Sequence, residues 1–462
     1  MSMMRLTEAA AMLGVPFDGV DAEVLRVSTD SRTIQPGDLF IALRGEKFDG
    51  GKFAAQALER GAAGVVLDAA QAPGMTPALR VDDTRLALGR LAAAWRRRFT
   101  IPLVAITGSN GKTTVKEMLA AILRVEAGSG DAVLATEGNL NNDIGLPLML
   151  LRLRQAHQFA VLEMGMNHAG EIDYLTRLAR PDVALINNAM TAHIGHLGSI
   201  ENIARAKGEI FNGLSDAGIA VINADDAHAG LWRDANARRS VIDFGIRQSA
   251  AVRGQYRPGT FGSALTLTLP NACLDIALQV PGEHNAMNAL AAATAAFALD
   301  VSLRSIDAGL SGFTGVKGRL QRKPALHGST FIDDTYNANP DSVQAALAVL
   351  AQQPGRKVLV LGDMGELGDD AAAMHAQIGQ AARAAGVDRL LALGDLSKET
   401  VAAFGAGAMH FERIQELLAE LENELAPDTT VLVKGSRFMQ MERVVNSFVE
   451  CPAASRPGHE GH

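Results

Sequence analysis

The sequence predicts a three-domain α/β protein, with a small α/β domain at the N-terminus, a central domain built on a parallel sheet and a C-terminal doubly wound, Rossmann-like domain. Its 462 residues are too many for one domain of about 100 to 200 residues. Apolar segments of strand length alternate with helical segments through the second and third parts of the chain, which is typical of parallel sheets covered by helices. Breaks in this pattern place the domains at residues 1–98, 99–313 and 314–450, and the remaining tail, 451–462, is expected to be disordered.

The composition is that of a globular protein, since 48% of the residues are hydrophobic and 20% are charged. The net charge of −8 argues against a nucleic-acid partner, because such binding rests on clustered lysine and arginine. The one dense basic run, Arg96-Arg97-Arg98, is interpreted as a solvated helix end. Two cysteines, Cys273 and Cys451, are too few for a disulfide framework. No apolar run approaches the roughly 18 residues of a membrane span, so a cytoplasmic protein without membrane insertion is expected.

The first part of the chain combines short helices and strands. A helix is predicted at residues 7–13 and strands at 38–43 and 64–67, with an alanine-rich helix before Gly61. A polar loop, residues 28–32, precedes the first strand. This order indicates a small α/β unit.

The central part opens with an apolar strand at 101–106, a glycine-rich loop and a helix at 112–123. Further strands that end in polar residues are predicted at 159–162, 183–186 and 219–222. Because ligands bind at the carboxyl edge of a parallel sheet, these polar ends are candidates for a site.

A glycine-spaced segment at 312–318 is predicted to be a hinge between the second and third domains, because glycines at that density resist both helix and strand. Beyond it, strands alternating with helices are predicted at 357–361, 389–393 and 430–433. The third part is therefore interpreted as a second doubly wound domain.

The glycine-rich loop carries the strongest functional signal. The loop follows a strand, and Lys112-Thr113 open a helix directly after its glycines. This arrangement turns backbone N–H groups and the helix dipole toward a phosphate, so the central domain is predicted to be a P-loop domain. Lys112 would contact the β- and γ-phosphates of a nucleotide, and Thr113 would bind Mg²⁺ through its hydroxyl. Ile106 stands where the general pattern has a glycine. The loop residues expected to bind the nucleotide are Gly108, Ser109, Asn110, Gly111, Lys112, Thr113 and Thr114.

Three further side chains are candidates for the same site. Glu163 ends a predicted strand at the edge where the loop lies, which suits a second magnesium ligand. Lys207 lies in the apolar face of a helix predicted at 201–214. Either its stem lies on apolar surface with the amine in water, or the amine is held neutral and adds CO2 to become a carbamate that binds a second Mg²⁺. His193, in the loop before that helix, is a candidate for the same metal or phosphate site.

These segments resemble those of the Mur ligases, a family of ATP-dependent amide-forming enzymes in a superfamily with the folylpolyglutamate synthetases. The resemblance covers nearly the whole chain. It rests on residues 107–114, Glu163, His193, Ala206-Lys207, residues 282–290 and Gly318-Arg319-Leu320. The phosphate loop of that family also lacks the early glycine, in agreement with Ile106.

The resemblance implies ATP and Mg²⁺ as cofactors. It implies that Asn288 binds adenine, and Asn285, three residues earlier on the same helix face, is expected to bind ATP with it. It also implies that Arg319 and Asp334 complete the ATP site when the third domain closes about the hinge and excludes water. The implied metal ligands are Thr113, Glu163, His193 and the carbamate of Lys207. The implied catalytic residues are Lys112, Lys207, His193 and Arg319.

Within the family, residues 137–147, 333–340 and 361–368 are similar to segments of the ligases that add D-alanyl-D-alanine to UDP-N-acetylmuramoyl-tripeptide. Such an enzyme phosphorylates the terminal carboxylate of the tripeptide, and the dipeptide amine then displaces the phosphate. The predicted substrate-binding residues are Ser28, Ser31, Arg32, Thr136, Asn139, Asn141, Asn142 and Asn167, together with Lys434 and Ser436. The last two lie at the end of the strand predicted at 430–433 and are candidates for binding either the incoming dipeptide or the tripeptide carboxylate. The third residue of the peptide, diaminopimelate or lysine, is left open, and a monomer is expected.

Other functions compete with this interpretation. Another amide ligase of the superfamily would differ in its acceptor, but the Asp-Asn-Pro-Arg motif of the diaminopimelate-adding members does not occur in the sequence. A nucleotide switch would need a guanine-reading Asn-Lys-x-Asp, which is also missing from the sequence. Gly362, Gly365 and Gly368 do not have the spacing of a dinucleotide-binding loop.

Overall fold

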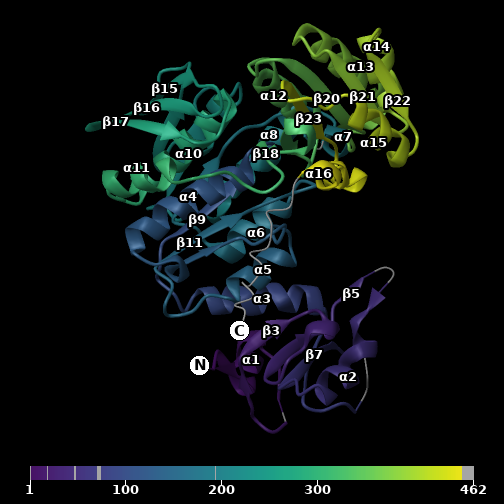
Figure 1. The fold of residues 1–462 in the computed structure, drawn as a ribbon. Helices are drawn as coiled ribbons and strands as arrows, with labels where there is room; N and C mark the ends of the chain where they lie inside the picture. The colour runs from purple at the N-terminus through teal and green to yellow at the C-terminus, as the bar shows by residue number, and fades with distance from the viewer. Residues whose placement is uncertain (1, 18, 46–47, 70–73, 193, 450–462) are drawn as a thin grey trace, which may run out of the picture.

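The computed structural model of the chain contains three large β-sheets, each the centre of one α/β domain (Figure 1). The structure describes residues 2–17, 19–45, 48–69, 74–192 and 194–449. His193 and the tail predicted to be disordered therefore lie outside the described residues. The predicted three-domain α/β fold is confirmed.

The N-terminal domain has a four-stranded parallel sheet in the order β3-β4-β7-β8. Leu39 and Phe40 of β4 point into hydrophobic cores on opposite faces of this sheet. The predicted helix at 7–13 and the strands at 38–43 and 64–67 are confirmed with small shifts at their ends. The elements are α1 (Leu6–Leu13), β3 (Arg26–Ser28), β4 (Asp38–Ile41), α2 (Ala54–Glu59), β7 (Gly64–Asp68) and β8 (Ala78–Val81).

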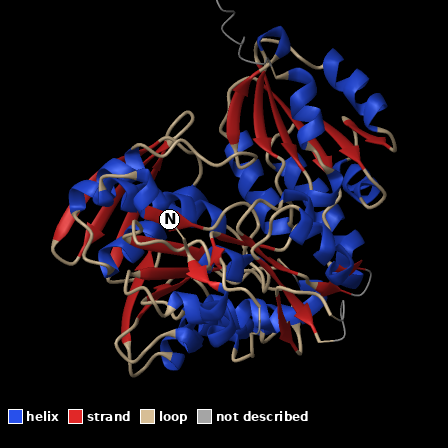
Figure 2. Cartoon of the chain, turned by 90° about the horizontal axis from the view of Figure 1, so that it is seen from below, coloured by secondary structure: helices blue, strands red, loops and turns tan. Residues whose placement is uncertain are grey.

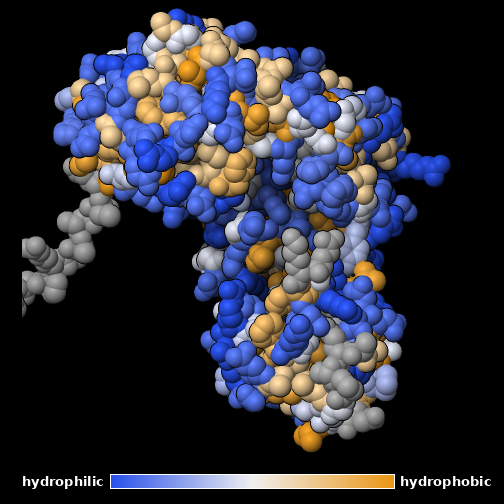
Figure 3. Space-filling model, turned by 90° about the vertical axis from the view of Figure 1, so that its right-hand side faces the viewer, coloured by the Kyte–Doolittle hydropathy of each residue, from blue (hydrophilic) through white to orange (hydrophobic). Residues whose placement is uncertain are grey.

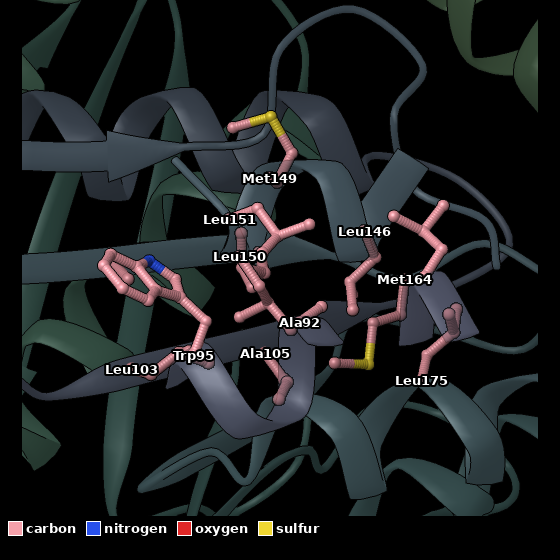
Figure 4. Close-up of a cluster of buried hydrophobic side chains, with 14 of the residues drawn as sticks. Ala92, Trp95, Leu103, Ala105, Leu146, Met149, Leu150, Leu151, Met164 and Leu175 are labelled. Carbon is pink, nitrogen blue, oxygen red and sulfur yellow. The ribbon is translucent and has the colours of Figure 1, made fainter. Parts of the chain in front are cut away.

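Helix α3 (Thr84–Arg96) joins the N-terminal domain to the central domain and packs on both. Figure 4 shows Ala92 and Trp95 of α3 beside Leu150 of α5 (Gly145–Leu150) in one cluster of buried side chains. This apolar contact fixes the N-terminal domain against the central one.

Arg96, at the end of α3, is buried, so the interpretation of Arg96-Arg97-Arg98 as a solvated helix end is wrong for its first residue. The guanidinium of Arg96 donates to three main-chain carbonyl oxygens, among them that of Ala179 at 3.0 Å. These acceptors offset the cost of burying the charge. Arg97 and Arg98 are exposed, as predicted.

Replacing Arg96 by methionine is expected to lower the free energy of unfolding by about 2 to 3 kcal/mol, because methionine keeps the apolar stem but leaves buried carbonyl oxygens without a donor. Urea denaturation measures this loss. The matched control is Arg97→Met, which alters an exposed neighbour and is expected to change the stability by less than about 0.5 kcal/mol. Equal stability of the two variants would contradict the structural role of Arg96.

The central domain contains a nine-stranded sheet in the order β10-β11-β9-β12-β13-β14-β15-β16-β17. The predicted parallel arrangement is confirmed for β9, β11, β12 and β13, which correspond to the four predicted strands. Strands β10 and β14 extend the parallel part without having been predicted, and β15, β16 and β17, which form an antiparallel edge, were also missed. The strands are β9 (Leu103–Thr107), β10 (Val133–Ala135), β11 (Phe159–Glu163), β12 (Val183–Ile186), β13 (Ile219–Asn223), β14 (Ser240–Gly245), β15 (Val252–Pro258), β16 (Ser263–Leu269) and β17 (Ala272–Leu278).

Helices cover both faces of this sheet, which explains why every residue of β9 is buried. Figure 2 shows helices lying against the sheets in each domain. One face carries α4 (Lys112–Ala127), α10 (Glu283–Ala298) and α11 (Leu303–Ser311), and the other carries α5 and α6 (Glu171–Ala179).

The single helix predicted at 201–214 is split into α8 (Ile200–Gly208) and the 3-10 helix η4 (Glu209–Gly213). A contact with α6 explains the change, because Oγ1 of Thr176 donates to the main-chain oxygen of Ile210 at 2.7 Å. That bond competes with the regular helical pattern.

The C-terminal domain has a six-stranded sheet in the order β18-β19-β23-β20-β21-β22, parallel except between β18 and β19. Helices lie on both faces, so the doubly wound prediction is confirmed. The elements are β18 (Gln321–Pro324), β19 (Thr330–Asp334), α12 (Pro340–Ala351), β20 (Arg356–Gly362), α13 (Ala371–Ala384), β21 (Arg389–Leu393), α14 (Ser397–Phe404), β22 (Ala408–Phe411), α15 (Ile414–Asn423), β23 (Thr429–Lys434) and α16 (Glu442–Phe448).

Residues 312–320 connect α11 to β18 without a regular helix or strand, as predicted. Gly315 and Gly318 have φ angles of 104° and 71°, which residues with a side chain rarely adopt. A hinge motion about this segment stays a prediction.

Among the described residues, none of the helices combines the length and the apolar character needed to cross a membrane. The face of the molecule in Figure 3 is largely hydrophilic, with hydrophobic residues in small groups.

Candidate active site

A cavity of about 1330 Å³ lies between the central and C-terminal domains. The phosphate loop, the ends of β11 to β13 and the start of α10 line one side, and the ends of β19 and β23 with α12 line the other. The carboxyl edges of two parallel sheets thus face one space, which is where such sheets bind ligands. The predicted site residues that line it are Ser109, Asn110, Gly111, Lys112, Thr113, Thr114, Asn141, Glu163, Asn285, Asn288, Arg319, Asp334, Lys434 and Ser436.

Lys112, at the start of α4, folds back over the phosphate loop. Its Nζ donates to the main-chain oxygens of Gly108 and Ser109 at 2.7 and 3.3 Å. Burial lowers the pKa of Lys112 below its usual value. Gly111 is required beside it, because φ is 81° and a Cβ there would lie 2.3 Å from Oδ1 of Asn288. The loop therefore has a backbone shape that only glycine fits, and it carries a lysine within reach of a bound phosphate.

Thr113 and Glu163 meet beside the loop. Oγ1 of Thr113 donates to Oε2 of Glu163 at 2.8 Å, and Nδ2 of Asn141 donates to Oε1 at 2.8 Å. Arg319, from the C-terminal domain, donates to Oγ1 of Thr113 at 3.0 Å. The structure thus brings together side chains that are far apart in the sequence.

This arrangement fits a magnesium ion. A hydroxyl and a carboxylate are the oxygen ligands that Mg²⁺ uses together with water and nucleotide phosphates. In the described ranges, no group of three His, Cys, Asp or Glu side chains could hold a metal by itself. Thr113 and Glu163 therefore suit an ion that takes most of its ligands from water and phosphate. His193 stays a predicted ligand.

An asparagine network supports the phosphate loop. Nδ2 of Asn187, just after β12, donates to the main-chain oxygen of Asn110 at 3.0 Å and to Oδ1 of Asn288 at 2.9 Å. Asn288 donates to Oδ1 of Asn285 at 3.3 Å. Oδ1 of Asn187 is buried and has no hydrogen-bond partner in the described part of the chain, so a bound molecule with an N–H or O–H group would satisfy it. The polar end of the predicted strand at 183–186 was the only sequence signal for Asn187.

Lys207 is buried, with 1% of its surface exposed, so the interpretation in which its amine reaches water is wrong. No hydrogen bond or ion pair to this amine occurs among the described residues. Burial, together with the positive charge of Lys112, holds the pKa of Lys207 well below its usual range. Burial thus favours the neutral form of the amine, which is the form that reacts with CO2. Lys207 does not itself line the cavity.

The C-terminal domain contributes charged and aromatic side chains. The guanidinium of Arg319 lies over the ring of Tyr336, 4.4 Å from its centroid. Nζ of Lys434 donates to Oδ2 of Asp334 at 2.5 Å and to the main-chain oxygen of Asn337 at 2.9 Å. Burial raises the pKa of Asp334, and Lys434 opposes this rise. Lys434 is thus held by Asp334, and its predicted contact with substrate stays a prediction.

Hydrogen bonds join the two domains across the cavity. Nδ2 of Asn339, the N-cap of α12, donates to Oδ1 of Asn110 at 2.8 Å. Asp341, in the first turn of α12, accepts from the N–H of Thr191 at 2.9 Å. The C-terminal domain therefore contacts the phosphate loop directly.

Several predicted residues lie away from the cavity. Ser28 and Arg32 are in the N-terminal domain, where both contact Asp30, at 3.2 and 2.8 Å. Thr136 is buried, and its Oγ1 accepts from the N–H of Glu163 at 2.9 Å. The predicted residues that do not line the cavity are Gly108, Ser28, Ser31, Arg32, Thr136, Asn139, Asn142, Asn167 and Lys207.

Family models match three consecutive parts of the chain. Residues 23–96 match the Mur ligase family catalytic domain, 106–296 the Mur ligase middle domain, and 318–437 the Mur ligase glutamate ligase domain. The chain is 43% identical over 454 residues to the UDP-N-acetylmuramoyl-tripeptide–D-alanyl-D-alanine ligase of Escherichia coli, covering 97% of this chain and 99% of that protein. It is 36% identical to the Bacillus subtilis protein of the same name, covering 92% and 93%.

Solved structures agree with these matches. The crystal structure of MurF from Acinetobacter baumannii aligns with a TM-score of 0.85 at 39% identity, over 92% of this chain and 93% of that one. MurF from Thermotoga maritima in complex with ADP aligns with a TM-score of 0.82 at 26% identity, over 91% and 96%. The chain belongs to the Mur ligase family. Within that family, its full-length relatives named above are UDP-N-acetylmuramoyl-tripeptide–D-alanyl-D-alanine ligases, or MurF.

Proposed function

We propose that the chain is the ATP-dependent ligase that joins D-alanyl-D-alanine to UDP-N-acetylmuramoyl-tripeptide, giving UDP-N-acetylmuramoyl-pentapeptide, ADP and phosphate in peptidoglycan synthesis. The observation that carries the proposal is the meeting of Lys112, Thr113, Glu163 and Arg319 in a cavity walled by two domains, in a chain similar over its full length to ligases of that name. Its nucleotide-linked substrates are cytoplasmic metabolites, so the reaction takes place in the cytoplasm.

In this proposal, the phosphate loop and α10 bind ATP. Backbone N–H groups at the start of α4 face the phosphates, and Lys112 leaves the loop oxygens to contact the terminal phosphates. Asn285 and Asn288 bind the adenine. Thr113 and Glu163 hold Mg²⁺, which supplies positive charge to the phosphates when it is bound.

The chemical difficulty is electrostatic, because the tripeptide carboxylate must approach a polyphosphate. Lys112 and Arg319 place positive charge where the two anions meet. The carboxylate oxygen attacks the γ-phosphorus and ADP leaves. The dipeptide amine then attacks the acyl carbon, loses a proton, and phosphate leaves with the bonding electron pair. Contact of the C-terminal domain with the phosphate loop keeps out the water that would hydrolyse the acyl phosphate.

Lys207 and His193 complete the proposed metal site. The buried amine of Lys207 would add CO2 and lose a proton, and the resulting carbamate would supply an oxygen ligand for a second Mg²⁺. The low pKa of Lys207 and its electrostatic coupling to Lys112 support this role.

Predicted substrate-binding residues lie both in the N-terminal domain and at the cavity. The UDP end of the tripeptide substrate would lie on the N-terminal domain and its peptide end in the cavity, so a substrate with a nucleotide at one end and a peptide at the other spans both. The proposed contacts to the UDP end are Ser28, Ser31 and Arg32. Asn139, Asn141, Asn142 and Asn167 are proposed to bind the rest of the substrate, and Lys434 and Ser436 either the incoming dipeptide or the tripeptide carboxylate.

With purified protein, ATP, Mg²⁺ and UDP-N-acetylmuramoyl-tripeptide, phosphate release is expected only when D-alanyl-D-alanine is added. Mass spectrometry should find the pentapeptide in equal amount to the phosphate. The same phosphate release with water alone would contradict the proposal. Amide formation with single amino acids but not with the dipeptide would favour the alternative, an amide ligase with another acceptor.

A further inference from the structure

A second lysine of α4 is buried, although the site described above does not use it. Lys116 has 1% of its surface exposed and lies one helical turn beyond Lys112. Its Nζ donates to the main-chain oxygen of Thr136 at 2.6 Å and contacts Oε1 of Glu117. Burying a lysine is costly, so a position this deep in the molecule depends on these two partners.

Thr136 connects Lys116 to Glu163, the carboxylate of the site, through hydrogen bonds. Thr136 follows β10, at the point where the chain leaves the sheet, and its N–H donates to the main-chain oxygen of Val161 at 3.0 Å. Its Oγ1 accepts from the N–H of Glu163 at 2.9 Å. Thr136 and Glu163 are 2% and 3% exposed, so water does not compete for this hydrogen bond.

Glu163 in turn contacts two residues that line the cavity. Its two carboxylate oxygens accept from Thr113 and Asn141, each at 2.8 Å. Asn141 belongs to the same loop as Thr136, and its main-chain oxygen accepts from the N–H of Gly165 at 2.8 Å. At one end of the loop 136–142, Thr136 is thus bonded to both Lys116 and β11, and at the other end Asn141 is bonded to Glu163 and to Gly165, just beyond that strand.

We propose that Lys116 is a positioning residue that ties the loop at 136–142 to the phosphate-loop helix, so that Glu163 and Asn141 keep their places relative to Lys112. An ammonium suits this task because a charged donor holds a carbonyl oxygen more strongly than a neutral one. Lys112 and Lys116 lie on one helix. The part of the site that binds ATP and the part that binds the tripeptide therefore share a rigid support. The inference rests on the proposed function, because it assigns the loop to UDP-N-acetylmuramoyl-tripeptide.

The surroundings of Glu117 provide matched variants. Glu117 is partly exposed and also faces Arg124 of the same helix, whose Nη1 lies 3.9 Å from Oε2. Arg124 does not contact Thr136. Lys116→Met therefore removes the bond to Thr136, whereas Arg124→Met removes only the other cation near Glu117.

Lys116→Met is expected to speed amide hydrogen–deuterium exchange of residues 136–145 in the ligand-free protein. It is also expected to raise the KM for UDP-N-acetylmuramoyl-tripeptide about 10-fold, which is the lower end of the range for losing a residue that supports a ligand-binding side chain. ADP affinity without Mg²⁺ and the KM for D-alanyl-D-alanine should stay within about twofold, because neither depends on this loop. Arg124→Met should leave all these quantities at the wild-type values. Lys116→Gln keeps a neutral donor and should give smaller changes of the same kind, and it serves if the methionine variant does not fold.

Wild-type exchange and KM values in a folded Lys116 variant would overturn the inference. Faster exchange spread over all three domains would also overturn it, because it would show a general role in stability. If the wild-type protein itself shows no dipeptide-dependent phosphate release, the proposed function fails instead. The exchange measurement needs no substrate and still decides whether Lys116 anchors the loop.

Discussion

Replacing Lys112 by alanine is expected to lower kcat/KM for ATP by about a thousandfold, the usual size for loss of one preorganised donor aimed at developing charge. The ammonium of Lys112 contacts the loop oxygens of Gly108 and Ser109 and is within reach of bound phosphates. Without it, the carboxylate and the γ-phosphate meet with less positive charge between them. Phosphate release coupled to pentapeptide formation measures the loss.

Two further variants test the specificity of the Lys112 result. Lys112→Arg keeps the charge but not the compact shape, so a loss smaller than that of alanine is expected. Lys398→Ala removes a half-exposed lysine of the C-terminal domain and should leave kcat/KM unchanged. Wild-type activity of Lys112→Ala would overturn the assignment of the glycine-rich loop to ATP.

Lys207→Met is expected to abolish turnover while making the folded protein more stable. Methionine fits the space of the unbranched lysine but cannot form a carbamate, so a proposed metal ligand is lost. Lys207 is buried with no acidic partner among the residues that the structure describes, so it is a cost to the folded state, and removing such a group often stabilises a protein. Retained turnover would contradict the carbamate proposal.

The pH dependence of stability gives an independent test of Lys207. In the unfolded chain a lysine has a pKa of about 10.4. Burial lowers the pKa in the folded protein. Between the two pKa values the unfolded state binds one more proton, so each pH unit downward costs the folded wild type about 1.36 kcal/mol relative to the methionine variant. In CO2-free buffer, urea denaturation should show the stability advantage of Lys207→Met growing as the pH falls below the pKa of the unfolded lysine, about 10.4. A constant difference would contradict the buried, neutral amine.

The strands that continuous apolar runs predict are found with little change. Val183–Ile186 and Arg389–Leu393 have the predicted bounds, because strands covered on both faces need an unbroken apolar run. The antiparallel strands β15 to β17 were missed. In β16, buried and exposed residues alternate, and this weaker signal does not stand out in a chain dominated by parallel strands.

The site residues that could be predicted are those marked by a short-range sequence pattern. Lys112 and Thr113 follow glycines at the start of a helix, and Glu163 ends a strand, so short-range patterns place all three. The pairing of Asn187 with Asn288 and of Asn110 with Asn339 joins segments that no local pattern relates. These contacts depend on how the domains pack.

The sequence by itself determined the strands that are continuous apolar runs, the glycine-rich loop with its lysine, and the resemblance to the Mur ligases, because backbone conformation and apolar periodicity are local properties. Only the tertiary structure decided which charged groups are buried. Arg96 donates to carbonyl oxygens at the end of α6 and beyond its own helix, and Lys116 donates to the main-chain oxygen of Thr136. Lys207 finds no acidic partner among the described residues. The charge state of such groups and the strength of their hydrogen bonds depend on how far water is excluded and on the partners that distant segments supply. Both conditions arise only when the chain has folded.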